Sequence, residues 1–198
     1  NWGSLSIPPT TFPQDTVMIL GLRGWTLHRP RVEVWDNWCD SIILLWIDDN
    51  NKKRCESFVA ATRPGKLPGF DNIRGDAHLE CGQYSYVFDK PANPKKLIPS
   101  NGVSIRRDPI KRGSPDSSLP LELGSNEIFI GDGGNNSSKV GRCSRGAQVI
   151  LNVHENGIQR YDEFMQILIA NHTGSSFLYT LISSNGLEPH DADAGGDD

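Results

Sequence analysis

The sequence predicts one mainly β domain, built as a curved mixed sheet or a sandwich with one principal helix. Glycine (20 residues) and proline (13 residues) together exceed their average usage in a chain of 198 residues, which favours many turns. Short apolar runs with the two-residue period of a strand recur, whereas one segment has the helical period. The length fits a single domain, so we expect a proline-rich lead-in at 1–15, the domain at 16–184 and an acidic tail at 185–198.

The first half of the chain is predicted to form strands separated by turns. TVMILGLRG (16–24) has the pattern of a buried strand that closes with glycine. The apolar runs at 41–48 and 55–62 flank the turn cluster DDNNKK, so they predict a hairpin. LECGQYSYVFD (79–89) alternates three aromatic residues, which places their rings on one face of a strand.

The second half continues the same pattern around two loops. VSIRRD (103–108) is predicted as a short strand between polar loops at 90–102 and 109–126. The strands EIFIG and AQVIL then enclose a glycine-rich loop, and SSFLYTLISS (175–184) alternates and closes the sheet.

One helix is predicted from Tyr161 to His172. Phe164, Ile167 and Leu168 follow the spacing i, i+3, i+4 of a buried helix face. Two acidic residues occupy its first turn, where the helix dipole favours negative charge.

Composition excludes several classes of function. The net charge of −4 provides no basic surface for phosphate backbones, so we expect no nucleic-acid partner. No apolar run approaches the roughly 18 residues of a membrane span. The cysteines are too widely spaced for a zinc site; they are Cys39, Cys55, Cys81 and Cys143. Their even number permits two disulfides, but we expect free, buried thiols. We expect no metal and no cofactor, and the tail is interpreted as solvated rather than as a calcium loop.

The glycine-rich loop can bring main-chain N–H groups close to a ligand. Gly131, Gly133 and Gly134 surround Asp132, and Gly146 follows at the start of the next strand. Consecutive N–H groups in such a turn can hold an anion or an oxyanion. The alternative is a glycine-rich connection with no ligand, in which Asp132 is an ordinary turn residue.

The stretch IFIGDGGNNSSKVGRCSRGAQVI (128–150) resembles the signature of L,D-transpeptidase-like (YkuD-type) domains, especially a branch from cell-wall and phage-associated proteins. In that family a histidine beside a glycine-rich loop precedes a Ser/Thr-x-Gly-Cys turn. Other pieces resemble the branch in the same order and cover most of 17–168; they are TVMILGLRG, WDNWCDSIILLW, FVAATRPG, GQYSYVF, VSIRRD and YDEFMQIL. The resemblance implies a transpeptidase-like fold and a place in a virion, a bacterial cell envelope or a periplasm.

The residues that carry the family's chemistry are missing from the matching positions. Ser144 and Gly146 match the turn, Arg145 occupies its variable position, and the nucleophilic cysteine falls on Ala147. The catalytic histidine falls on Gly131, or on Asp132 if the loop shifts by one residue. A methyl group cannot attack a carbonyl and glycine cannot accept a proton, so the resemblance implies a catalytically inactive domain.

Other interpretations of the same residues stay open. Ala147 could replace a cysteine of an active cell-wall enzyme, or a Cys143–His154 pair could have taken over the chemistry. Arg106 and Arg107 could contact the carboxylate of a peptidoglycan stem peptide, or form an ordinary exposed pair.

Tryptophans around one predicted strand could stack on sugars, although core packing is the simpler role; they are Trp35, Trp38 and Trp46. The predicted function is therefore an inactive module that binds peptidoglycan or serves structurally in an assembly. A docking module for protein partners is a further alternative.

Overall fold

The computed structural model describes residues 14–26, 29–30, 36–65, 75–108, 119–124, 127–135, 139–144, 146–155 and 158–183. Within these ranges the chain is mainly β with one α-helix, which confirms the predicted fold class. No helix in the described part is both long and apolar enough to span a membrane. The predicted lead-in and tail lie almost entirely outside the described residues.

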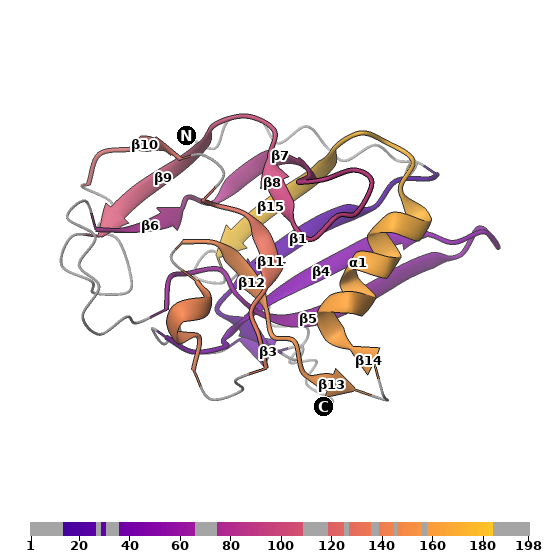
Figure 1. Cartoon of the computed structure of the whole chain (residues 1–198), viewed down its shortest axis with the longest axis horizontal. Coiled ribbons are helices and arrows are strands. Elements are labelled where there is room, and N and C mark those ends of the chain that lie inside the picture. The colour runs from indigo at the N-terminus through magenta and orange to yellow at the C-terminus, as the bar shows by residue number, and fades with distance from the viewer. Residues whose placement is uncertain are drawn as a thin grey trace, which may run out of the picture.

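The main sheet closes on itself as a barrel (Figure 1). Around the barrel the strands are β1 (Met18–Arg23), β15 (Phe177–Ser183), β7 (Gly82–Phe88), β8 (Leu97–Pro99), β11 (Ile130–Asp132), β12 (Gln148–Ile150), β5 (Lys53–Ala61) and β4 (Asp40–Ile47). The pairs β1–β15 and β11–β12 are parallel, and the other neighbours are antiparallel. The sheet is therefore mixed, as predicted, and its curvature closes it into a barrel.

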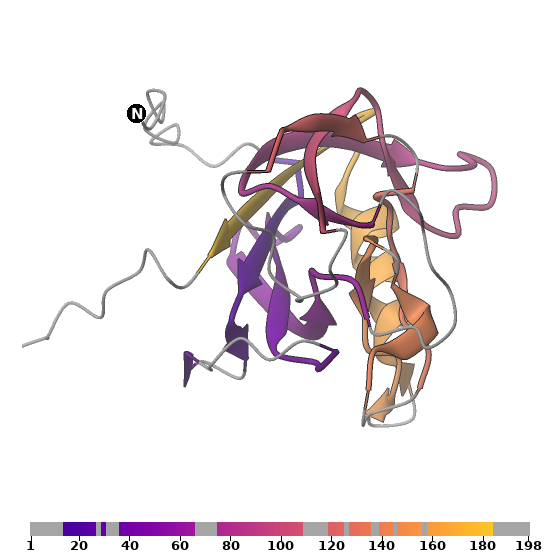
Figure 2. The same cartoon turned by 90° about the vertical axis from the view of Figure 1, so that its left-hand side faces the viewer.

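Smaller elements surround the barrel. They are the sheet of β10 (Glu122–Gly124), β9 (Val103–Asp108) and β6 (Asp76–Leu79), the pairs β13 (His154–Glu155) with β14 (Ile158–Gln159) and β2 (Trp25–Thr26) with β3 (Arg29–Pro30), the 3-10 turn η1 (Gly141–Cys143) and the helix α1 (Arg160–Asn171). The three-stranded sheet lies at the top of the molecule and the β13–β14 pair at the bottom in both views (Figures 1 and 2).

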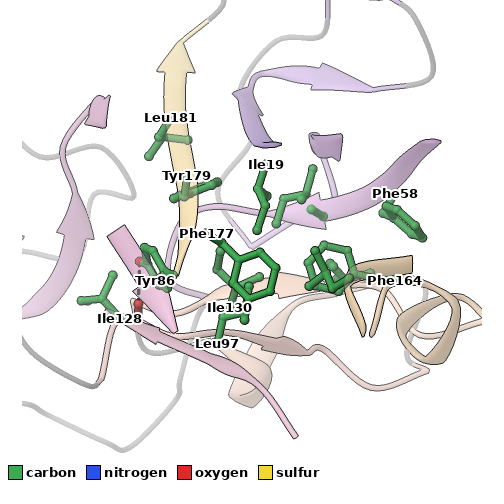
Figure 3. Close-up of a cluster of buried hydrophobic side chains, with 14 of the residues drawn as sticks. Ile19, Phe58, Tyr86, Leu97, Ile128, Ile130, Phe164, Phe177, Tyr179 and Leu181 are labelled. Atoms are coloured by element: carbon green, nitrogen blue, oxygen red, sulfur yellow. Dashed lines mark hydrogen bonds between the residues drawn. The ribbon is translucent and has the colours of Figure 1, made fainter. Parts of the chain in front are cut away.

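Alternating side chains of the barrel strands fill its interior. On β15 the alternating residues Phe177, Tyr179 and Leu181 are all buried. The ring of Tyr179 packs edge-to-face on Tyr86 at 5.5 Å between centroids. Phe164 brings α1 into the same core, where it meets Phe58 of β5 edge-to-face at 5.4 Å (Figure 3).

Most predicted elements are present within a residue or two of their expected ends. The hairpin of β4 and β5 is confirmed, the strand at 103–108 is confirmed as β9, and α1 begins and ends one residue earlier than predicted. The predicted loops at 90–102 and 109–126 were wrong in part, because they contain β8 and β10. Each of these strands has three residues, which is too short to show a two-residue period.

Candidate functional site

The barrel brings the two halves of the glycine-rich motif together. β11 and β12 pair in parallel, with Ile130 opposite Gln148 and Gly131 opposite Val149. Ala147 therefore lies two residues out of register with Gly131. The turn that precedes β12 lies at one end of this short pair, and the glycine-rich loop that follows β11 lies at the other.

The main-chain N–H groups predicted to hold an anion already donate within the protein. Gly133 N–H donates to the Ile150 carbonyl at 2.8 Å, and Gly134 N–H donates to Asp132 Oδ1 at 2.6 Å. Gly146 N–H donates to Ser144 Oγ at 3.2 Å. These three donors are therefore unavailable to an anion or oxyanion in this conformation, contrary to the prediction of an anion cradle.

Ser144 is a buried residue whose side chain stabilises the motif turn by hydrogen bonds. It is fully buried, and its hydroxyl donates to the Ala147 carbonyl at 2.7 Å while accepting from Gly146 N–H. Gln148 Nε2 donates to the Gly146 carbonyl at 3.1 Å, and the Tyr179 hydroxyl donates to Gln148 Oε1 at 3.2 Å. Hydrogen bonds thus link the turn to the barrel interior, and the serine hydroxyl is positioned to support the turn rather than to attack a substrate.

Aromatic rings fill the space beside the motif. Ala147 is 2% exposed and belongs to an apolar cluster with Trp38. A Cβ atom added to Gly133 would lie 2.5 Å from the Trp38 ring, and one added to Gly131 would lie 2.7 Å from the Phe129 ring. Trp38 is therefore a core residue here, and the family's histidine position has no room for a side chain unless Phe129 moves.

Asp132 connects the glycine-rich loop to the start of α1. Its Oδ2 accepts a hydrogen bond from Asn152 Nδ2 at 3.0 Å, while its Oδ1 accepts from Gly134. Asn152 is buried, and its Oδ1 accepts from Tyr161 N–H in the first turn of α1 at 3.0 Å. Such a bond satisfies one of the donors that a helix start leaves open. Sequence reasoning missed Asn152, because it precedes the helix by too many residues to resemble a cap.

Cys143 is poorly suited to take over the missing chemistry. It is half-buried in η1, and burial, with a smaller contribution from the Asp132 charge, raises the pKa of its thiol. A raised pKa disfavours the nucleophilic thiolate. None of the four cysteines forms a disulfide, and Cys55 and Cys81 are exposed rather than buried as expected.

The two arginines that could contact a stem-peptide carboxylate or form an ordinary exposed pair have partners inside the protein. Arg106 pairs with Glu80 at 3.0 Å and also donates to the Leu119 carbonyl. Arg107 pairs with Glu122 at 3.2 Å and with Glu127 at 2.9 Å. These carboxylates offset the positive charge that a stem-peptide carboxylate would need, and the substrate role of Arg106 and Arg107 stays a prediction. Arg145 lies outside the described residues.

A buried polar network near the end of β1 was not predicted. Arg23 donates to Thr62 Oγ1 at 3.1 Å and to the carbonyls of Thr62 and Leu79 at 3.0 Å each. Asp40 accepts from Gly24 N–H at 2.7 Å, from Thr62 N–H at 2.6 Å and from the Thr62 hydroxyl at 2.8 Å. The residues come from three strands and the segment after β5, so no local sequence pattern could reveal them.

His78 of β6 lies beside this network. The imidazole is 1% exposed, and its buried Nδ1 has no hydrogen-bond partner. Burial lowers the pKa of His78 to about 3, and the positive charges of Arg23 and Arg63 act in the same direction. This histidine is therefore neutral and enclosed.

No family model, curated protein or solved structure matches this chain. In the described ranges, no group of three or more histidine, cysteine, aspartate or glutamate side chains could hold a metal ion.

Proposed function

We propose that this chain is a catalytically inactive, L,D-transpeptidase-like domain that serves as a structural module of an assembly in contact with a bacterial cell envelope, such as a phage tail. The observation that carries the proposal is the burial of Ala147. Its methyl group packs in an apolar cluster at the position where the family signature has its reactive sulfur.

Three requirements of acyl transfer are unmet around this position. The reaction needs a thiolate, a nearby base and donors for the developing oxyanion. Ala147 has no nucleophilic atom and Gly131 has no side chain. The amides of Gly133, Gly134 and Gly146 bond to acceptors of the protein itself. Stabilisation of an oxyanion by these donors would first require the motif to rearrange.

The packing around Gly131 favours natural loss of activity over a single engineered substitution. An enzyme whose nucleophile alone was replaced would keep space for its histidine. Here the Phe129 ring lies within 2.8 Å of the place where a Cβ of residue 131 would stand. The ammonium of Lys96 lies 4.4 Å from the centroid of that ring and holds it further in place. The space is therefore occupied by the protein's own side chains.

Restoring the sulfur tests the proposal. Ala147→Cys and the double variant Gly131→His/Ala147→Cys would be incubated with muropeptides, and cross-linked or cleaved products measured by mass spectrometry. We expect no turnover by either variant. We also expect the thiol introduced by Ala147→Cys to resist alkylation while Cys55 and Cys81 react, because those two native thiols are exposed and position 147 is buried.

Ala61→Cys is the matched control, because Ala61 is equally exposed, at 2%, and belongs to the same apolar cluster. It reports the effect of a buried thiol that lies outside the motif. Turnover by Ala147→Cys alone would refute the proposal and support the interpretation of an active enzyme. Binding of muropeptides to the unmodified protein without turnover would assign peptidoglycan binding as the retained role.

A docking role for protein partners is favoured by two exposed leucines. Leu123 of β10 is 81% exposed and Leu121, just before the strand, is 57% exposed. Both lie in the 109–126 segment, and among the described strands β10 pairs with β9 alone. If this face binds a partner, a smaller amount of the double variant Leu121→Ser/Leu123→Ser should be recovered with the purified assembly than of the unmodified protein. Unchanged recovery would remove the docking role of this face.

A further inference from the structure

His172 lies at the start of the seam, the parallel pair of β1 and β15 that closes the barrel, and contacts both strands there. It follows α1 directly, and its Nδ1 accepts a hydrogen bond from Val17 N–H at 3.2 Å. Its Nε2 lies 3.0 Å from the Ser176 carbonyl. The ring stacks on Phe177 with 4.1 Å between centroids. Val17 immediately precedes β1, and Phe177 begins β15, so the imidazole sits where these parallel strands start.

These two hydrogen bonds fix the protonation state of the ring. A main-chain N–H can only donate, so Nδ1 must accept from Val17 and cannot carry a proton. The proton of the neutral ring is therefore on Nε2, where it donates to Ser176. A doubly protonated imidazole would present an N–H to the Val17 N–H, and that hydrogen bond could not form.

We propose that His172 is an acid-released clasp that fastens residues 14–17 to the start of the β1–β15 seam. The neutral ring holds Val17, and the adjoining Thr173 N–H donates to the Asp15 carbonyl at 3.1 Å. Protonation removes the first of these bonds and frees residues 14–17 to move away from α1.

The surroundings of the ring favour its neutral form. Burial lowers the pKa of His172, and its hydrogen bond to the Ser176 carbonyl opposes this effect. The last turn of α1 carries no basic residue, and β15 carries no charged side chain. The acidic residues near the clasped segment are Asp15 itself and, on the neighbouring β4–β5 turn, Asp48 and Asp49, which line one pocket together with Gln14.

Hydrogen exchange resolved to single amides tests the clasp. Protection of Val17 N–H, corrected for the intrinsic pH dependence of exchange, would be measured from pH 8 to pH 4.5. For a bond that forms only to the neutral ring, we expect protection to fall by up to tenfold for each pH unit below about 6.5. The Leu20 N–H, within β1, serves as the internal reference and should change little.

One variant separates titration of His172 from general acid sensitivity. In His172→Asn, the amide oxygen can accept from Val17 but does not titrate, so protection should no longer depend on pH. Constant protection of Val17 in the unmodified protein, or the same fall in His172→Asn, would overturn the proposal. The readout is independent of the proposed function, since it concerns one backbone hydrogen bond.

Discussion

Replacing His78 by leucine is expected to make the fold less sensitive to acid. The imidazole is almost fully buried in β6, its Nδ1 has no hydrogen-bond partner, and its pKa is lowered from 6.5 to about 3 by burial and by the charges of Arg23 and Arg63. The folded protein therefore keeps this ring neutral over a pH range in which the unfolded chain protonates it. Leucine fills a similar volume and takes no proton.

The magnitude follows from the linkage between proton binding and folding. Between pH 6.5 and about 3 the unfolded state binds more protons at this residue, so its contribution to stability is intact above pH 6.5 and is lost as the pH falls. With about 1.36 kcal/mol per pKa unit, the loss relative to pH 8 is about 1.4 kcal/mol at pH 5.5 and about 2.7 kcal/mol at pH 4.5. His78→Leu should be spared this loss.

Urea unfolding between pH 8 and pH 4.5 measures the effect. The free energy of unfolding of His78→Leu minus that of the unmodified protein should rise as the pH falls, whatever its value at pH 8. His154→Gln controls for removal of an exposed histidine. A difference that stays constant across this range would show that His78 is not held neutral by the fold, and would refute the reasoning.

Two further substitutions test the packing near the motif and the polar network. Asp40→Asn should lower the free energy of unfolding by about 3 kcal/mol, because the new amide group would place a donor against the N–H and hydroxyl donors of Thr62. Thr62→Val should lower the free energy of unfolding by less. Equal costs in chemical denaturation would contradict a central role for the carboxylate. Gly133→Ala should lower stability by roughly 2–3 kcal/mol, because its Cβ would lie 2.5 Å from Trp38. Gly102→Ala, whose Cβ meets a movable exposed leucine at 3.1 Å, should cost much less; a matching loss would argue against the collision.

Local patterns predicted most of the secondary structure. The alternation in β15 and the turn cluster between β4 and β5 are properties of neighbouring residues, and both gave the correct elements. The same patterns failed for β8 and β10, whose three residues are extended because partner strands hold them. Pairing with a distant strand leaves little trace in so short a stretch.

The sequence predicted which residues form the candidate site, but not whether their polar groups are free to bind a ligand. The residue at position 147 can be read from the sequence, and so can the absence of a histidine at position 131. Whether an amide such as that of Gly133 is available cannot be read, because its acceptor on Ile150 is 17 residues away and reaches it through strand pairing. Asn152 was missed for a related reason, since its partners lie on a loop and a helix that only the fold brings together.

The sequence by itself determined the mainly β class, the single principal helix and the chemical identity of each motif side chain, because these depend on residue type and short-range spacing. Only the tertiary structure decided that the sheet closes, that Ala147 is covered and that His172 meets Val17. Closure pairs β1 with β15 across almost the whole described chain. That pairing is favoured because residues far apart in the sequence bury their apolar surface in one shared core. The total buried area cannot be read from any short stretch of sequence.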